Sequence, residues 1–122
     1  MANTKSDPER EQRIHNEIIV DAYGEEERAI GWYYYLQNQL EFPFTAICIS
    51  KRAISPLQIE EETEVIGMSD EGECVHEMFV TIRWEKNGLA VPLMQLKPVH
   101  ASAQTEQAVA DWHYWVERGY QF

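Results

Sequence analysis

The chain lacks any apolar run near the roughly 18 residues that a membrane-spanning helix needs. Its polar start, residues 1–7, also lacks the apolar stretch of a signal peptide. Only two of its 122 residues are cysteines, Cys48 and Cys74, and without an export signal both thiols are expected to stay reduced. These absences predict a cytoplasmic protein. The length predicts one domain, residues 1–122, in which residues 1–7 form a flexible leader.

Basic residues are also scarce, with 10 Lys and Arg against 21 Asp and Glu and a formal net charge of -11. Such a charge argues against nucleic acid and anionic membranes as partners, and leaves cations and basic proteins. Residues 57–77 contain no Lys or Arg at all. Close carboxylates repel one another unless they are well solvated or a counter-cation offsets the repulsion. Eight of them stand in this stretch: Glu60, Glu61, Glu62, Glu64, Asp70, Glu71, Glu73 and Glu77.

Recognisable catalytic motifs are missing as well. No Ser, Cys or Thr stands in a nucleophile motif, and no glycine-rich phosphate loop occurs. The four histidines lack the paired spacing of a zinc site, and Cys74 with His76 supplies only two ligands. No segment fits the EF-hand pattern D-x-[DN]-x-[DN]-G-x5-E. We therefore predict a binding protein that is not an enzyme, and any calcium site must have another design.

Three helices are predicted. Asp7 and Pro8 are typical of a helix start, and apolar residues at helical spacing extend this helix to Ala22 or Tyr23. After Gly24, a second helix begins with three glutamates and ends before the FPF step at 42–44. A third is expected from about Thr105 to Arg118. The predicted buried stripes are Ala29, Trp32, Leu36 and Leu40 in the second helix, and Ala108, Trp112, Trp115 and Val116 in the third.

Between the second and third helices, short β-branched runs predict strands at 45–50, 63–68, 78–84 and 89–92. Residues 78–84 show a period of two that puts Met78, Val80, Ile82 and Trp84 on one face, as in a strand with one buried face. Asn87-Gly88 predicts a type I′ hairpin turn. The expected fold class is α+β, with N-terminal helices, a small SH3-like antiparallel β-barrel and a C-terminal helix.

This arrangement gives the acidic stretch a geometry. The loop between the second and third strands would hold Asp70, Glu71 and Glu73. If the first two strands pair antiparallel, the end of the second helix lies nearby and brings Asn38 and Glu41 toward that loop. Calcium accepts about six to eight oxygens in flexible geometry, whereas magnesium fits such an irregular set poorly. An exposed acidic loop that binds no metal is the alternative interpretation.

Several strings then point to a known family: EIIVDAY at 17–23, ERA at 27–29, WYYYL at 32–36, FPF at 42–44, HEMFV at 76–80, LAVPL at 89–93 and DWHYW at 111–115. The chain resembles the small acidic calcium-binding proteins of cyanobacteria and other bacteria from about residue 9 to the C-terminus. The resemblance implies a calcium binder without EF-hands that acts as a cytosolic buffer or sensor, with a role in regulating heterocyst differentiation. At the position of Asn38, the proteins that this chain resembles carry Asp, so the chain has one formal negative charge fewer there.

The sequence and the resemblance together predict reversible Ca²⁺ binding through clustered carboxylates. Bound calcium would offset their repulsion, so stability should rise with calcium by mass action. The chief alternative is an acidic SH3-like interaction module that binds a basic partner. A weaker second site is expected at Glu60 to Glu64. The predicted metal ligands are Asn38, Glu41, Asp70, Glu71, Glu73 and Glu77.

Overall fold

The computed structural model describes residues 6–20 and 22–119. Most of the predicted leader, residues 1–5, lies outside the described residues. Asp7 at its end is held in place, because its carboxylate accepts a hydrogen bond from the Arg10 N–H over 3.1 Å and its own N–H donates to the Tyr114 hydroxyl over 2.9 Å. Asp7 is therefore the N-cap of the first helix, as its position before proline predicted.

Three α-helices are described: α1 (Pro8–Arg13), α2 (Glu25–Gln39) and α3 (Ala103–Glu117). The prediction that the first helix reaches Ala22 or Tyr23 was wrong. It continues only as a π-helical turn, η1 (Ile14–Ile18), because Ile19 leaves the helical conformation with φ -112° and ψ 25°. The N-cap of α3 is Ser102, whose hydroxyl accepts from the Thr105 N–H, so the helix begins two residues before the expected Thr105.

Five antiparallel strands form one sheet in the order β4-β3-β2-β1-β5. Their bounds are β1 (Phe44–Cys48), β2 (Glu62–Met68), β3 (Phe79–Ile82), β4 (Leu89–Pro92) and β5 (Leu96–His100). A short 3₁₀ turn, η3 (Leu93–Gln95), separates β4 from β5, and these two strands are not paired in the described part of the chain. The α+β class is confirmed, whereas the SH3-like barrel is not, because the sheet stays open.

The hairpin between β3 and β4 was predicted correctly, but its turn type was not. A type I′ turn needs positive φ at both Asn87 and Gly88, whereas the residues with positive φ are Glu85 at 50° and Gly88 at 77°. The reason is that β3 ends at Ile82. Because Ile82 pairs with Leu89, six residues, 83–88, connect the two strands, and within this connection the Gly88 N–H donates to the Trp84 carbonyl over 2.9 Å.

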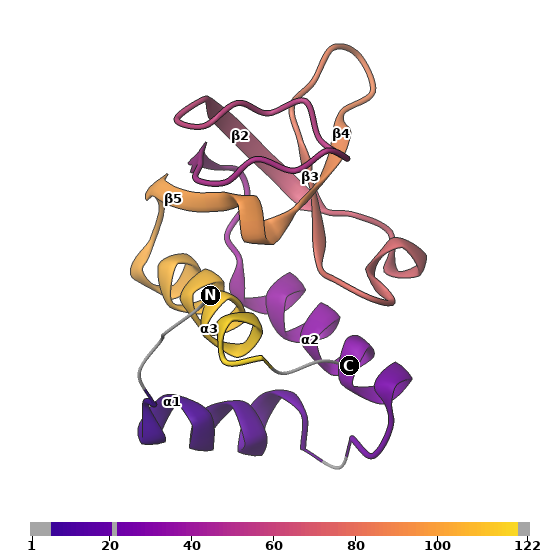
Figure 1. Cartoon of the computed structure of the whole chain (residues 1–122), viewed down its shortest axis with the longest axis vertical. Helices are drawn as coiled ribbons and strands as arrows, with labels where there is room; N and C mark the ends of the chain where they lie inside the picture. Colours follow the sequence, from indigo (N-terminus) through magenta and orange to yellow (C-terminus); the bar gives the residue numbers. More distant parts are fainter. Residues whose placement is uncertain (1–5, 21, 120–122) are drawn as a thin grey trace.

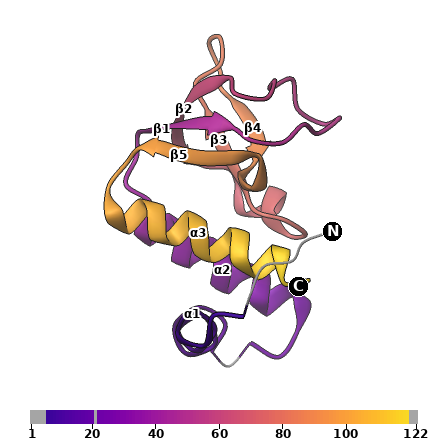
Figure 2. The ribbon, with the colours of Figure 1, turned by 60° about the vertical axis from the view of Figure 1, so that its left-hand side comes forward.

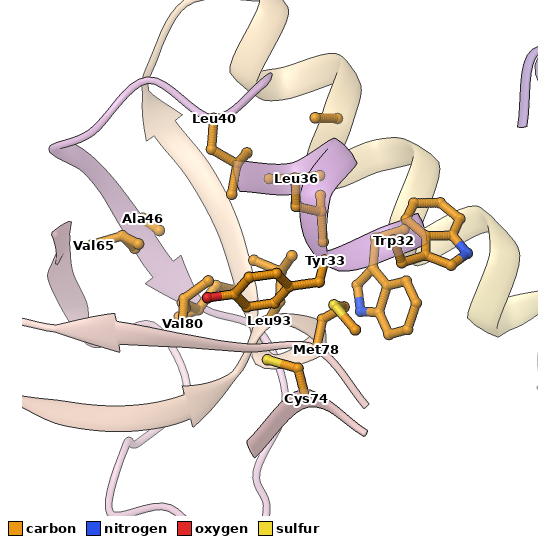
Figure 3. Close-up of a cluster of buried hydrophobic side chains, with 14 of the residues drawn as sticks. Trp32, Tyr33, Leu36, Leu40, Ala46, Val65, Cys74, Met78, Val80 and Leu93 are labelled. Carbon is orange, nitrogen blue, oxygen red and sulfur yellow. The ribbon is translucent and has the colours of Figure 1, made fainter. Parts of the chain in front are cut away.

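The molecule has three layers, with α2 and α3 lying between the sheet and α1 (Figures 1 and 2). The predicted stripe of α2 is buried, with at most 5% exposure at Ala29, Trp32, Leu36 and Leu40. Figure 3 shows Trp32, Leu36 and Leu40 of this stripe, together with Tyr33 beside Val80 and Met78 from the sheet region. Trp32 also packs against Trp112 of α3, with ring centroids 5.1 Å apart. The aromatic side chains of α2 thus join the sheet to α3.

A buried carboxylate joins the three helices. Asp111 of α3 has no exposed surface. Its Oδ1 lies 2.9 Å from Arg10 Nε and 2.5 Å from Arg13 Nη2, both of α1, and its Oδ2 accepts from the Tyr35 hydroxyl of α2 over 2.7 Å. A buried charge needs such partners because desolvation is costly. The sequence analysis did not identify this cluster.

Replacing Asp111 should therefore destabilise the fold strongly. Asp111→Asn keeps the size of the side chain but leaves two guanidinium groups without their carboxylate, so the free energy of unfolding should fall by about 3 kcal/mol. Urea denaturation measures this change. Glu106→Gln, at an exposed position of α3, is the control and should cost at most about 0.5 kcal/mol. A similarly small loss for Asp111→Asn would contradict the structural role of the cluster.

Gly31 permits the close approach of α2 to η1. A Cβ atom at this position would lie 2.3 Å from the Ile18 carbonyl oxygen, which is backbone and cannot rotate away. Gly31→Ala should thus lower the free energy of unfolding by about 1–3 kcal/mol, although alanine favours helix by about 1 kcal/mol. Gly67→Ala is the matched control, because no atom lies within 4 Å of its added Cβ. Equal stability of the two variants in urea would refute this packing.

Candidate functional site

Part of the acidic stretch folds into a short 3₁₀ turn, η2 (Glu71–Cys74), between β2 and β3. The side chains of Asp70, Glu71 and Glu73 are exposed, and Cys74 is buried with 1% exposure. Cys74 fixes the turn to the sheet, because its Sγ accepts from the Phe79 N–H over 3.3 Å. The segment therefore presents three carboxylates to solvent from a base anchored in the core.

Two tyrosines of α2 hold η2 from the other side. The Tyr33 hydroxyl donates to the Ser69 carbonyl over 2.9 Å, and the Tyr34 hydroxyl donates to Glu71 Oε1 over 3.2 Å. The turn consequently lies over the N-terminal half of α2 (Figures 1 and 2). Three successive residues of a helix point in different directions, so the hydroxyls of these tyrosines reach different parts of the fold. The run of three tyrosines is therefore the sequence signal for this role in holding η2.

The carboxylates of Asp70, Glu71 and Glu73 create a negative potential that raises the pKa of neighbouring groups. Glu71 raises the pKa of Tyr34 by opposing the phenolate charge and by accepting its hydrogen bond. Burial raises the pKa of Tyr33, and Cys74, Glu71 and Asp70 add to that rise. Burial also raises the pKa of Cys74, with Glu73, Asp70 and Glu71 contributing. A surface that disfavours new negative charge in this way favours a cation.

Asn38 and Glu41 are exposed, and the structure places them differently. Asn38 lies one helical turn beyond Tyr34 on the same face of α2. Glu41 follows α2, and its N–H donates to Thr105 Oγ1 over 2.8 Å, so its backbone lies beside the first turn of α3. The sequence argument put the start of β1 beside the end of β2, but Phe44 pairs with Val65, three residues before Met68. The loop therefore begins farther from Glu41 than expected.

Glu77 and Glu64 already have basic partners, and Glu61 already accepts a hydrogen bond. Glu77 forms a two-fold hydrogen bond with Arg52, at 2.9 Å from Nη1 to Oε2 and 3.0 Å from Nη2 to Oε1. This pairing raises the pKa of Arg52. Glu64 pairs with Arg83, and Glu61 Oε1 accepts from the Gln58 N–H. These carboxylates are less available to a metal than those of η2, for which the described part of the chain contains no salt bridge.

Within residues 6–20 and 22–119, no three Asp, Glu, His or Cys side chains are grouped closely enough to hold a metal ion. Asp70, Glu71 and Glu73 are neighbours in sequence, but their carboxylates do not form such a group. Calcium also accepts backbone carbonyls, amide oxygens and water as ligands, and a group of Asp, Glu, His and Cys side chains does not include these. The residue types fit calcium, and a complete oxygen cage requires the side chains of η2 to turn toward one another.

A groove separates η2 from α2. Its volume is about 520 Å³, and Glu25 and Glu26 of α2 contribute to its lining opposite Glu71. Glu25 Oε1 also lies 3.7 Å from Nδ1 of the exposed His76. Glu17, Asp21 and Glu25 stand four residues apart, the spacing of one face of a continuous helix, but α2 begins only at Glu25. The structure places Glu25 at the groove, and Asp21 lies outside the described residues.

Comparisons with known proteins give a consistent result. A search of curated proteins gives no significant match. Two solved structures are similar over 100% of this chain and 100% of theirs. The crystal structure of Anabaena CcbP is 41% identical with a TM-score of 0.87, and a calcium-binding protein in the calcium-binding form is 40% identical with a TM-score of 0.85.

The described helices offer no candidate for a membrane span.

The family model of the CcbP proteins, described as calcium binding, matches residues 12–116. This match covers most of the chain, including α2, the sheet, η2 and nearly all of α3. The chain therefore belongs to the CcbP family of calcium-binding proteins.

Proposed function

We propose that this protein binds Ca²⁺ reversibly at η2, with Asp70, Glu71 and Glu73 as the principal ligands. The observation that carries this proposal is the presence of three exposed carboxylates within four residues, without a basic partner in the described part of the chain. Their combined charge suits a hard dication, and backbone carbonyls and water complete a set of six to eight oxygens. The similarity to a solved calcium-binding protein in the calcium-binding form supports the choice of metal.

The remaining predicted ligands take supporting places in this proposal. Asn38 offers a neutral amide oxygen one turn beyond Tyr34, and Glu41 offers an exposed carboxylate at the end of α2. Glu77 would have to exchange Arg52 for the metal. Glu60 to Glu64 form a weaker second site, because Arg83 already neutralises Glu64. We thus rank the ligands by the partners that each must give up.

Calcium uptake should change the conformation of η2. The three carboxylates have to converge, and Glu71 has to exchange its bond with Tyr34 for the metal. Space for this movement exists, since no atom lies within 4 Å of a Cβ built on Gly72. A local rearrangement of this kind favours a cytosolic sensor over a passive buffer. The role in heterocyst differentiation is part of the proposal on the strength of the family resemblance alone.

Isothermal titration of chelator-stripped protein tests the binding itself. The titration uses calcium at about 0.1 M salt, where exposed charges are screened beyond about 10 Å, with magnesium as a competitor. Saturable binding at a small whole-number stoichiometry is expected. Weak heat that disappears with added salt would reject the calcium site and favour the interaction module that binds a basic partner.

Paired substitutions identify the ligands. Asp70→Asn with Glu71→Gln keeps the size of both side chains but removes two charged ligands, so the Kd for calcium should rise by about a hundredfold or more. Glu9→Gln with Glu106→Gln removes the same charge from exposed positions on α1 and α3 and is the matched control. If both pairs weaken binding equally, the effect comes from net charge and the assignment to η2 is incorrect.

Removal of calcium should lower stability. A ligand that binds only the folded state adds about 2.7 kcal/mol to the free energy of unfolding at a hundred times its Kd. The melting temperature should consequently rise with calcium and return to its starting value with a chelator. Differential scanning calorimetry measures this shift, which the Asp70→Asn and Glu71→Gln double variant should lack. An unchanged melting temperature in saturating calcium would argue against binding to the folded state.

A further inference from the structure

The groove between α2 and η2 combines an apolar lining with acidic residues. Ala29 and Ile30 of α2 and Val75 beyond η2 contribute the apolar part. Ile30 is 38% exposed and Val75 is 46% exposed, so both present apolar surface to solvent. Glu25, Glu26 and Glu71 add three exposed carboxylates. No Lys or Arg of the described residues lines this groove.

A second groove of similar size has a different electrostatic character. It lies between β5 and α3 and has a volume of about 470 Å³. Its lining includes Arg10 and Lys97 as well as Glu106 and Glu117, so charges of both signs are present. A cation therefore gains less there than at the groove between α2 and η2, where Lys and Arg are absent from the described lining and His76 is the one residue of that lining that can become cationic.

We infer that the groove between α2 and η2 is a docking site for a cationic segment of a partner protein that carries an apolar anchor residue. The apolar side chain would cover Ile30 and Val75, and flanking Lys or Arg side chains would meet Glu25, Glu26 and Glu71. A volume of about 520 Å³ accommodates a few side chains. Charge complementarity selects this partner, because nucleic acid and anionic membranes would be repelled.

The docking site shares one residue with the proposed calcium site. Glu71 lines the groove, and it is also a principal ligand in the proposed function. A bound dication would neutralise part of the negative charge and draw Glu71 away from the groove. Calcium should thus weaken docking, and this part of the inference rests on the proposed function.

The first test uses a synthetic fluorescein-labelled peptide in which two leucines are flanked on both sides by lysines. Fluorescence anisotropy is recorded in chelator, so the result does not depend on calcium. Saturable binding is expected. A control peptide with serine in place of both leucines keeps the charge, and its affinity should be at least about tenfold lower, because a buried leucine contributes about 1.5–3 kcal/mol. Equal affinity of the two peptides would overturn the inference, since charge alone would then explain the binding.

Substitutions in the protein locate the peptide. Ile30→Gln with Val75→Gln should weaken binding about tenfold, whereas Ile54→Gln with Ile59→Gln changes isoleucines that are 61% and 59% exposed elsewhere and should have no effect. Circular dichroism verifies that the variants are folded. If the two pairs behave alike, the peptide does not occupy this groove.

A charge pair gives an independent check. Glu25→Gln with Glu26→Gln should weaken peptide binding by about three- to tenfold at low salt. Glu9→Gln with Glu106→Gln also removes two glutamates from first helical turns, and it should leave the affinity nearly unchanged. An equal loss in the control would show nonspecific attraction and overturn the inference. Self-association through the groove, visible by sedimentation, would assign it to a second copy of the chain and also overturn it.

The calcium effect is measured last. Saturating calcium should weaken the leucine peptide about three- to tenfold, and the Asp70→Asn and Glu71→Gln double variant should lose this sensitivity. Peptide binding unaffected by calcium, in protein that calorimetry shows to be calcium-loaded, would refute the coupling. If calorimetry shows no calcium uptake, the proposed function and the coupling fail together, while the titration in chelator still decides the docking site.

Discussion

The position of α2 governs both the core and the candidate site, and the buried Asp111 carboxylate secures that position. Its oxygens bind Tyr35 of α2 and two arginines of α1 from a fully buried place on α3. Successive residues of a helix point about 100° apart. With Tyr35 directed to Asp111, Tyr33 and Tyr34 reach Ser69 and Glu71. A single helix orientation thus connects the buried ion cluster to the acidic surface.

The carboxylates of this chain divide into two groups by their partners. Asp111, Glu77 and Glu64 lie against arginine and serve the fold. Asp70, Glu71 and Glu73 are exposed and lack such partners in the described part of the chain. An unpaired carboxylate in water gives up only hydration when it binds a cation, whereas a paired one must also lose its arginine. This difference supports the proposal of η2, rather than Glu64 or Glu77, as the metal site.

Calcium and a cationic segment would respond to the same negative potential in different ways. A metal ion needs several oxygens around one point, which requires the side chains of η2 to converge. A peptide needs spaced charges along an apolar surface, which the groove beside α2 already provides. Because Glu71 belongs to both sites, the two ligands are expected to oppose each other, and the protein would then act as a calcium-dependent partner switch.

Much of the fold was predictable from local sequence. The α2 helix, its buried stripe and strand β4 follow from apolar periodicity and from Gly and Pro positions, which act over a few residues. The end of the first helix at Ile18 was not predictable in this way. The backbone of α2 approaches there through Gly31, and residues 13 positions apart in sequence determine the outcome. The type of the β3–β4 turn depended similarly on strand register, because the pairing of Ile82 with Leu89 leaves six residues between the strands.

The sequence by itself determined the composition of the site: a highly acidic chain, a stretch free of basic residues, and the family to which its aromatic strings belong. These properties are fixed by residue identity alone. Only the tertiary structure decided which carboxylates remain available, because Arg52, Arg83, Arg10 and Arg13 reach their partners from distant parts of the chain. It also placed η2 over the N-terminal half of α2, since strand register and the burial of Tyr33 set that contact through long-range packing.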